Sequence, residues 1–488
     1  MAFAPSSRAL TLLSTDFETN PFTQGWTNLG TGSNWITSEH FSGTHALRVA
    51  TNSFISPFLN TTPLQWYRLS FKSKAPGTVN NTGSIGYAYW AAQFFDTNGT
   101  LLNDDQYSSV LASANWVTNE FRIRAKHTAG TNATLVPARM KILFQPIGSQ
   151  PLYVDDVLVE TTTPDEVVHW ADALYDRIPA KLNYVPKTNR WSHLPLTLQK
   201  LRTGQSLRIV MLGDSVQQDT ANAPLDAYLR QLYPGSTIEL ISSTKGGTGM
   251  QYFKAHVPEF VTSYRPDLLV LGGISNEDNM TNFLSIISQV RSNDTALGRT
   301  TEFLLLTKAW SPNNVPQSGN YFFASTLAEL DSVPSNNVTV PNDYRGHLLN
   351  FAYTNNAEFL DLTGIASQFI YGPATTAGLG PPVSAGSPYS YWLRDYIHSN
   401  DHGKMILGRM LEAYFAPAPR LQVKRNGGSL QLSWPLASTG YQLETRLKFA
   451  ANSPWTNRPT TFVVTNGMNV LTTNVSAGTN ALFFRLHR

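Results

Sequence analysis

Residues 208–215 read Arg-Ile-Val-Met-Leu-Gly-Asp-Ser, a short apolar run that leads into Gly213, Asp214 and Ser215. A run of this length that ends at a glycine is typical of a strand buried in a sheet. Similar runs follow and alternate with stretches of helical spacing. The predicted strands are 207–212, 238–241, 268–271, 302–307 and 358–362, and the predicted helices are 225–232, 282–291 and 404–414. This alternation predicts a parallel sheet covered by helices on both faces.

Polar or glycine residues follow several of these strands, where a parallel sheet collects its reactive groups. They are Ser215, Gly247, Ser275 with Asn276, and Lys308 with Trp310. Far downstream, Asp395 and His398 supply an acid and an imidazole about one helical turn apart. A serine at the end of a strand and a distant Asp-x-x-His are the groups of a Ser-His-Asp hydrolase.

The regions on either side have a different texture. Residues 10–161 consist of short alternating segments broken by Gly, Asn and Thr, which predicts a β-sandwich. Residues 164–416 hold the α/β pattern, which opens with an amphipathic helix near residue 165. Residues 419–488 return to β texture and predict a small C-terminal β-sandwich. The sequence therefore predicts a multidomain protein with a central α/β domain between two β domains.

The composition argues against several classes of function. The formal net charge is +3 over 488 residues and no basic run appears, which argues against a nucleic-acid partner. The chain has no cysteine, so disulfides, thiolate zinc sites and Cys nucleophiles are excluded. No apolar run reaches the length of a membrane span.

Only 14% of the residues are charged, and Asn, Thr, Ser and Gly are abundant. Such a surface suits an exported β-rich protein, either secreted or periplasmic. Residues 1–14 lack the charged-then-apolar layout of a signal peptide. We therefore expect a mature sequence from which an export signal has been removed and to which a Met has been added.

The middle region resembles the SGNH (GDSL-like) hydrolase superfamily, which implies an α/β/α domain with three layers. Its first block matches Gly213, Asp214 and Ser215, and implies that Ser215 is the nucleophile. Asp214 is expected to brace the turn.

The second block is a glycine after the next strand, whose N–H would stabilise the oxyanion together with the N–H of Ser215. Gly247 has the favoured register, with Gly246 and Gly249 as alternatives, and a plain flexible loop is the competing interpretation.

The third block departs from the family pattern, which is Gly-x-Asn-Asp. Here Asn276 lies about one position late and no Asp follows it. The resemblance implies that Asn276 is a further oxyanion donor, with Ser275 as its substitute. Loss of one such donor slows the reaction by about 100- to 1,000-fold and does not abolish it.

The last block, Asp-x-x-His followed by a polar loop and Gly403, is the most specific. It implies that His398 is the general base and that Asp395 orients its imidazole. In a competing interpretation, His398 and His402 form half of a metal site. No Glu accompanies them in a His-Glu-x-x-His motif, which disfavours the metal site. The resemblance implies neither a metal nor another cofactor. Asp361 is a rival acid, although it also fits an ordinary residue at a strand end.

The first region resembles the jelly-roll carbohydrate-binding modules found beside polysaccharide-degrading enzymes. The likeness rests on residues 16–18, 41–47 and 153–157. Several side chains near the strand ends or the last block are candidates for substrate binding, with core packing as the alternative. They are Lys308, Trp310 and Trp392, together with Tyr389 and Tyr391.

The sequence thus predicts an exported serine esterase that removes O-acetyl groups from a polysaccharide. One alternative is a broad-specificity carboxylesterase that acts on small or aryl esters. Another is a glycan-binding protein whose hydrolase core has decayed, which the altered third block favours.

Overall fold

The structure is a computed structural model. It describes residues 9–50, 52–76, 88–110, 113–125, 136–146, 150–186, 190–273, 280–309, 344–379, 391–393, 398–417, 421–435, 442–446, 455–457, 462–465, 468–474 and 483–487. The chain divides into two compact units. One consists of Met1–Lys181 and Asn189–Gly408, and the other of Leu182–Thr188 and Arg409–Arg488.

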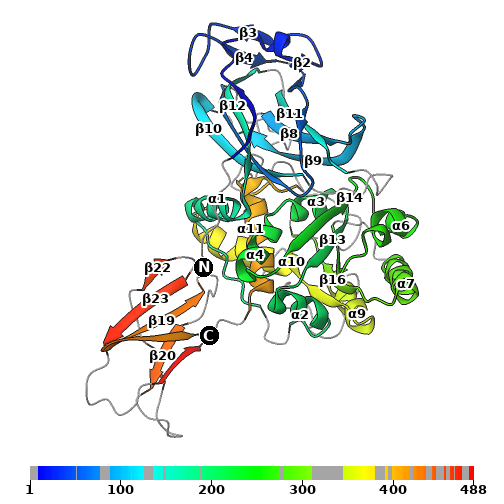
Figure 1. Ribbon diagram of the computed structural model, residues 1–488, viewed down its shortest axis with the longest axis vertical. Coiled ribbons are helices and arrows are strands. Elements are labelled where there is room, and N and C mark those ends of the chain that lie inside the picture. Colours follow the sequence, from blue (N-terminus) through cyan, green and yellow to red (C-terminus); the bar gives the residue numbers. More distant parts are fainter. Residues whose placement is uncertain are drawn as a thin grey trace. The chain divides into compact units, whose positions relative to one another are not determined.

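The first part of the chain is β-rich, as its alternating sequence predicts, and its described strands pair in two antiparallel sheets (Figure 1). One sheet has the order β10-β7-β12-β4-β3, with β1 beside β12. Its strands are β1 (Thr11–Thr15), β3 (Asn34–Ile36), β4 (Ala46–Val49), β7 (Trp66–Ala75), β10 (Ser113–Arg124) and β12 (Leu152–Thr162). The other has the order β2-β5-β11-β8-β9, with β6 beside β11. Its strands are β2 (Thr27–Asn28), β5 (Phe54–Ile55), β6 (Leu59–Asn60), β8 (Ala88–Phe95), β9 (Leu101–Val110) and β11 (Arg139–Pro146), and a 3-10 helix, η1 (Pro21–Gln24), precedes β2.

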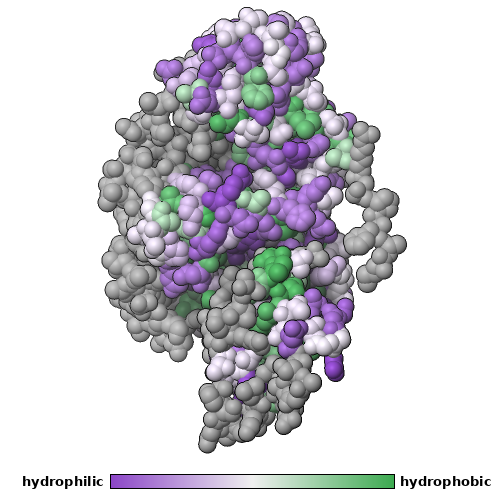
Figure 2. Space-filling view, turned by 90° about the vertical axis from the view of Figure 1, so that its left-hand side faces the viewer, coloured by the Kyte–Doolittle hydropathy of each residue, from purple (hydrophilic) through white to green (hydrophobic). Residues whose placement is uncertain are grey.

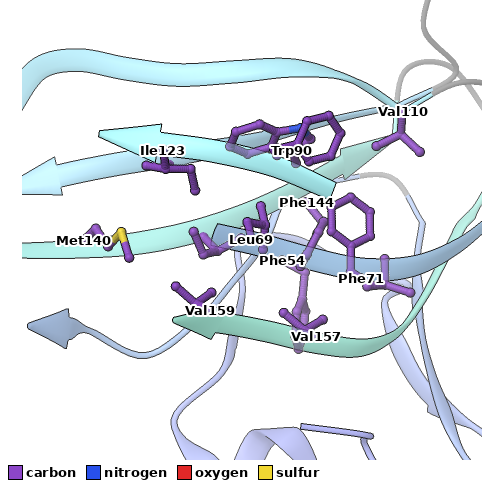
Figure 3. Packing of buried hydrophobic residues seen from close by; sticks show 14 of the residues in the cluster. Phe54, Leu69, Phe71, Trp90, Val110, Ile123, Met140, Phe144, Val157 and Val159 are labelled. Atoms are coloured by element: carbon purple, nitrogen blue, oxygen red, sulfur yellow. The ribbon is translucent and has the colours of Figure 1, made fainter. Parts of the chain in front are cut away.

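One buried apolar cluster joins these two sheets. Along β7, Leu69 and Phe71 are buried while Arg68, Ser70 and Lys72 are partly exposed, because successive side chains point to opposite faces of a strand. Figure 3 shows the resulting packing, in which residues of β7 and β12 face residues of β5, β8 and β11. The labelled members are Phe54, Leu69, Phe71, Trp90, Val110, Ile123, Met140, Phe144, Val157 and Val159. The polar and apolar alternation of the sequence thus places one face of each sheet in this core.

A parallel sheet lies at the centre of the middle region (Figure 1). Its order is β14-β13-β15-β16-β17, and every neighbouring pair is parallel. The strands are β13 (Leu207–Gly213), β14 (Ile238–Thr244), β15 (Leu268–Gly272), β16 (Glu302–Leu306) and β17 (Glu358–Leu360). Nearly every residue of these strands is buried, which explains why they read as continuous apolar runs.

Helices precede, connect and follow these strands. They are α1 (Pro164–Arg177), α2 (Pro195–Thr203), α3 (Ser215–Ala221), α4 (Leu225–Leu232), α5 (Met250–Lys254), α6 (Val257–Phe260), α7 (Met280–Leu297), α9 (Tyr344–Thr354), α10 (Leu362–Phe369) and α11 (Asp401–Phe415), with η2 (Thr262–Tyr264) and η3 (Ile370–Ala374). Apolar residues of α5, α6, α7 and α9 share one buried cluster with residues of β13, β14, β15 and β16. Strand β14 pairs with one edge of β13, and β15, the next strand in the sequence, pairs with its other edge. Such a reversal of strand order is where parallel sheets bind their ligands.

The start of the α/β region is set by local chemistry. Thr163 is the N-cap of α1, and its side chain accepts the N–H of Glu166 while the Glu166 carboxylate accepts the N–H of Thr163. This capping box satisfies two N–H groups that a helix end leaves without partners. Pro164, which follows, has no N–H to satisfy at the first helical position. The chain therefore changes from strand β12 to helix α1 within one residue.

The second unit contains short antiparallel strands in its described residues. One sheet has the order β18-β19-β23-β22 and the other the order β21-β20-β24. The strands are β18 (Gln422–Asn426), β19 (Ser429–Pro435), β20 (Gln442–Arg446), β21 (Thr456–Asn457), β22 (Val463–Thr465), β23 (Met468–Asn474) and β24 (Phe483–His487). Leu432, Trp434, Leu443 and Leu471 form its small buried cluster.

Hydrophilic residues cover much of the described surface on the face drawn in Figure 2. Within the ranges given above, none of the helices combines the length and the apolar character that crossing a bilayer requires.

Candidate functional site

Ser215 is the first residue of α3 and follows directly on the turn at the end of β13. Asp214 caps this helix, because its Oδ1 accepts the N–H of Val216 at 2.9 Å and that of Gln217 at 3.4 Å. The Asp214 side chain is 3% exposed. Asp214 therefore braces the turn that presents Ser215, as the sequence indicates.

Two glycines allow the ends of β13 and β15 to approach each other beside this turn. A Cβ atom on Gly213 would overlap the carbonyl oxygen of Gly272 and would lie 2.6 Å from Cβ of Gln217. A Cβ atom on Gly273, whose φ is +106°, would overlap the carboxylate of Asp214. The backbone geometry at the turn before Ser215 therefore requires the absence of side chains at both positions.

His398 lies against Ser215. Its Nε2 atom is 2.8 Å from Ser215 Oγ, although 183 residues separate the two in the sequence. This is the distance at which an imidazole takes up the proton of a hydroxyl group. The structure thus brings together the serine and the histidine that the sequence singled out.

Hydrogen bonds from the backbone and the side chain of Asn400 join the loop around His398 to its neighbours. Asn400 donates its N–H to the carbonyl oxygen of Trp392 at 3.0 Å, and its side-chain oxygen accepts the N–H of Gly403 at 3.1 Å in the first turn of α11. Its side-chain nitrogen also donates to the carbonyl oxygen of Tyr391 at 3.0 Å. The short polar loop that the sequence shows after His398 therefore caps helix α11.

Among the three glycines after β14, the structure brings Gly246 beside Ser215, because a Cβ atom there would lie 3.6 Å from Cβ of Ser215. Gly247, at φ +68°, has open space where its Cβ would lie. Gly249 caps helix α5. Since Lys245 donates its N–H to the carbonyl oxygen of Gly213 at 3.0 Å, the start of this loop is fixed to the end of β13. The role of Gly247 as an oxyanion donor stays a prediction.

Lys308 lies after β16 and is 2% exposed. Burial lowers the pKa of Lys308 to about 7, and the nearby charge of Asp214 opposes part of that decrease. Its backbone carbonyl oxygen accepts the hydroxyl of Thr363 at 2.6 Å. The side chain thus lies in the interior close to Asp214, and its contact with a substrate stays a prediction.

Trp392 is completely buried. Its ring contacts Phe369 edge-on at 5.1 Å, and its Nε1 donates to the carbonyl oxygen of Leu379 at 2.9 Å. These contacts favour core packing, the alternative that the sequence left open for this residue. The hydrogen bond to Leu379 also satisfies the Trp392 N–H, whose burial without an acceptor would destabilise the fold.

Two competing candidates have other partners. Oδ1 of Asp361 accepts the N–H of Gly364 at 3.0 Å and the hydroxyl of Thr307 at 3.1 Å, as expected for a polar residue at a strand end. His402 lies in α11, where its ring stacks on Tyr391 at 4.2 Å and its Nδ1 is 3.1 Å from the Tyr391 carbonyl oxygen. Burial lowers the pKa of His402. Among the described residues, no group of three or more His, Cys, Asp or Glu side chains is arranged to hold a metal ion.

Several predicted site residues lie outside the described residues. They are Asp395, Asn276 and its substitute Ser275, Trp310 and Tyr389. Their roles remain predictions from the sequence.

The structure adds one residue that the sequence did not single out. Asp219 lies in α3 and is 2% exposed, and its Oδ2 accepts the N–H of Ser399 at 2.7 Å. One sequence signal was available, because Asp219 follows Ser215 by four residues and therefore shares its face of the helix.

No family model matches the chain, and no curated protein matches it. Solved structures resemble parts of it. A two-domain esterase active on acetylated mannans, co-crystallized with mannopentaose, is 12% identical, with 64% of this chain and 92% of that chain covered and a TM-score of 0.32. The CBM22-1 xylan-binding domain of Xyn10C from Paenibacillus barcinonensis is 16% identical, with 31% of this chain and 94% of that chain covered and a TM-score of 0.22.

A gut microbial diltiazem-metabolizing enzyme is 13% identical, with 47% of this chain and 56% of that chain covered and a TM-score of 0.27.

Proposed function

We propose that the protein is an exported serine esterase of the SGNH type that removes O-acetyl groups from a polysaccharide. The observation that carries this proposal is the 2.8 Å distance between Nε2 of His398 and Oγ of Ser215. A hydroxyl in this position becomes a nucleophile when the imidazole accepts its proton. The nucleophile turn supports the same interpretation, because Asp214 and the neighbouring glycines hold Ser215 at the carboxyl end of β13.

The proposed reaction has two steps. Ser215 Oγ attacks the carbonyl carbon of the acetyl ester while His398 takes the Oγ proton. The oxyanion that forms accepts hydrogen bonds from the N–H groups of Ser215 and Gly247 and from the side chain of Asn276. The intermediate then collapses, the bond to the sugar oxygen breaks, and His398 gives its proton to that oxygen. An acetyl-serine remains and the sugar hydroxyl is free.

In the second step, water attacks the acetyl-serine and His398 takes a proton from that water. Collapse of this second intermediate breaks the bond to Ser215 Oγ, which regains its proton from His398, and acetate leaves. Asp395 is proposed to hold the imidazole in the tautomer that accepts the serine proton and to stabilise the imidazolium. All groups in this sequence of steps belong to the chain, the ester and water.

The choice of a polysaccharide rests on the first region, whose sequence resembles carbohydrate-binding jelly rolls. The proposal of export rests on the low charge content and on the many polar uncharged residues. A central three-layer α/β/α domain between two β-sandwiches is the architecture proposed for such an enzyme. The proposed domains are 10–161, 164–416 and 419–488.

The test is the release of acetate from acetylated xylan, mannan and pectin by the purified protein and by its Ser215→Ala variant. We expect release by the wild-type protein only. Cleavage of longer acyl or aryl esters without acetate release from any glycan would instead identify a broad-specificity carboxylesterase. Equal background rates for both proteins on every ester, p-nitrophenyl acetate included, would favour a glycan-binding protein and refute the proposed catalysis.

A further inference from the structure

Asp219 is a buried carboxylate on the nucleophile helix. It lies four residues after Ser215 in α3, so that both residues share one face of the helix. The side chain is 2% exposed, and a buried carboxylate is stable only when hydrogen-bond donors compensate for its lost hydration. The partners of Asp219 therefore indicate what it does.

One partner is the N–H of Ser399, which donates to Oδ2 of Asp219 at 2.7 Å. Ser399 is 1% exposed, so water does not compete for this N–H group. A hydrogen bond between a carboxylate and a backbone N–H is shorter and stronger than one between neutral groups. Ser399 directly follows His398 in the chain. The bond thus fixes the backbone next to the imidazole.

Further hydrogen bonds connect the described residues of this loop to other segments. Those of Asn400 join it to the segment that contains Trp392 and to the first turn of α11. Within the described part of this loop, His398 Nε2 contacts Ser215 Oγ of α3, and the Ser399 N–H donates to Asp219 of α3. The Asp219 bond therefore attaches the histidine loop to the helix that carries the nucleophile.

We propose that Asp219 is a positioning residue that holds His398 against Ser215 through the backbone of Ser399. This inference rests on the proposed esterase function. Proton transfer requires the two heavy atoms to lie within hydrogen-bond reach, and a displacement of about 1 Å costs on the order of 100-fold in rate. Without Asp219, the N–H of Ser399 would be buried without this acceptor, and the loop would shift to find another.

The experiment compares Asp219→Ala with Asp219→Asn. Asparagine keeps an oxygen atom where the carboxylate oxygen accepts the Ser399 N–H, whereas alanine removes it. On p-nitrophenyl acetate, we expect kcat to fall about 10- to 100-fold in Asp219→Ala with KM within about twofold of the wild type. In Asp219→Asn, we expect kcat to recover to within about tenfold of the wild type.

A second readout does not depend on turnover. A fluorophosphonate forms a bond between its phosphorus and the Oγ of an activated serine, and fluoride leaves. We expect the rate of this labelling at Ser215 to fall in parallel with kcat in Asp219→Ala and to recover in Asp219→Asn. Thermal unfolding and circular dichroism of each variant show whether the fold is kept.

Asp294→Ala is the matched control. Asp294 in α7 is also a buried aspartate, 4% exposed, and its Oδ2 accepts a backbone N–H, that of Thr301, at 2.6 Å. Its partners are Thr301 and Arg299, neither of which belongs to the nucleophile turn or to the histidine loop. We expect Asp294→Ala to lower the melting temperature and to leave kcat and the labelling rate within about twofold of the wild type.

The inference is overturned if Asp219→Ala keeps kcat and the labelling rate within twofold of the wild type, or if Asp219→Asn is as impaired as Asp219→Ala. It is also overturned if Asp294→Ala loses as much activity as Asp219→Ala, since any buried carboxylate would then have the same effect. Failure of the proposed function itself is recognised separately, because the wild-type protein would then neither hydrolyse an ester nor be labelled at Ser215.

Discussion

Arg124 of β10 and Asp226 of α4 form a buried ion pair between the first β region and the α/β region. Arg124 Nε lies 3.3 Å from Asp226 Oδ2, and the two side chains are 2% and 3% exposed. Trp66 of β7 donates its Nε1–H to the same carboxylate oxygen at 3.1 Å. Burial lowers the pKa of Arg124, and the charge of Asp226 opposes that decrease. Asp226 thus supplies a counter-charge to a guanidinium in the interior.

The first prediction follows from this pair. Asp226→Ala leaves a buried cation without its counter-ion, and we expect it to lower the free energy of unfolding by about 3–5 kcal/mol. Replacement of both residues, Arg124→Met with Asp226→Leu, removes both charges, and we expect most of that loss to be recovered. Urea unfolding of the single and double variants measures the effect. A loss below about 1 kcal/mol in Asp226→Ala would contradict the dependence of Arg124 on this carboxylate.

The second prediction concerns the close approach of β13 and β15 beside the turn that carries Ser215. In Gly213→Ala, the new methyl group overlaps the Gly272 carbonyl oxygen and presses on Gln217, so that the turn carrying Ser215 must move. We expect an esterase rate reduced by about 100-fold, in line with the cost of misplaced reacting groups, and a lower melting temperature.

The control for this variant is Gly298→Ala, just beyond α7. Gly298 has a φ of +63° and open space around the added methyl group, so its substitution costs only the backbone strain of about 1–2 kcal/mol. We expect normal kcat in Gly298→Ala, measured with p-nitrophenyl acetate. Wild-type kcat in Gly213→Ala would show that the contact with Gly272 does not position the serine.

Much of the parallel sheet was predictable because its strands are buried on both faces. The predicted strand 207–212 corresponds to β13 (Leu207–Gly213), and the predicted helix 225–232 corresponds to α4 (Leu225–Leu232). In both cases the spacing of apolar residues determines the type of element. Helix α7 (Met280–Leu297) is longer than the predicted 282–291. The prediction ended too early because the last turns of the helix are polar and carry no apolar spacing. Asp294 in those turns is buried and pairs with Arg299 and Thr301, contacts that no periodic pattern encodes.

The candidate site was predictable where a local motif carries it. Ser215 follows a strand and a glycine, and His398 belongs to an Asp-x-x-His motif; the structure places the two side chains at hydrogen-bond distance. Asp219 was not predictable in this way, since its partner Ser399 lies 180 residues away and a lone Asp in a helix is ordinarily a surface residue. For Trp392, the sequence suggested a role in substrate binding that the tertiary contacts do not favour. Its position before the last block is compatible with substrate binding, whereas its contact with Phe369 depends on the tertiary fold.

The third prediction concerns Lys308 and the pH dependence of stability. In the folded protein, burial lowers the pKa of Lys308 to about 7 from its ordinary value of 10.5, which the unfolded chain regains. Between these two pH values, the unfolded state binds more protons than the folded state. The Lys308 contribution to the free energy of unfolding therefore rises with pH in this window and is smallest below about pH 7.

We expect Lys308→Met to remove this contribution. Between pH 7.5 and 9, the wild-type protein should gain about 1–2 kcal/mol of stability relative to the variant, since one pH unit corresponds to about 1.4 kcal/mol for a fully shifted group. Chemical unfolding at several pH values measures how the free energy of unfolding changes with pH in the wild type and in Lys308→Met. Lys424→Met is the control, because Lys424 is exposed on β18. We expect the free energy of unfolding of this variant to change with pH as that of the wild type does. Parallel slopes for the wild type and Lys308→Met would mean that Lys308 remains protonated in the folded protein throughout this range.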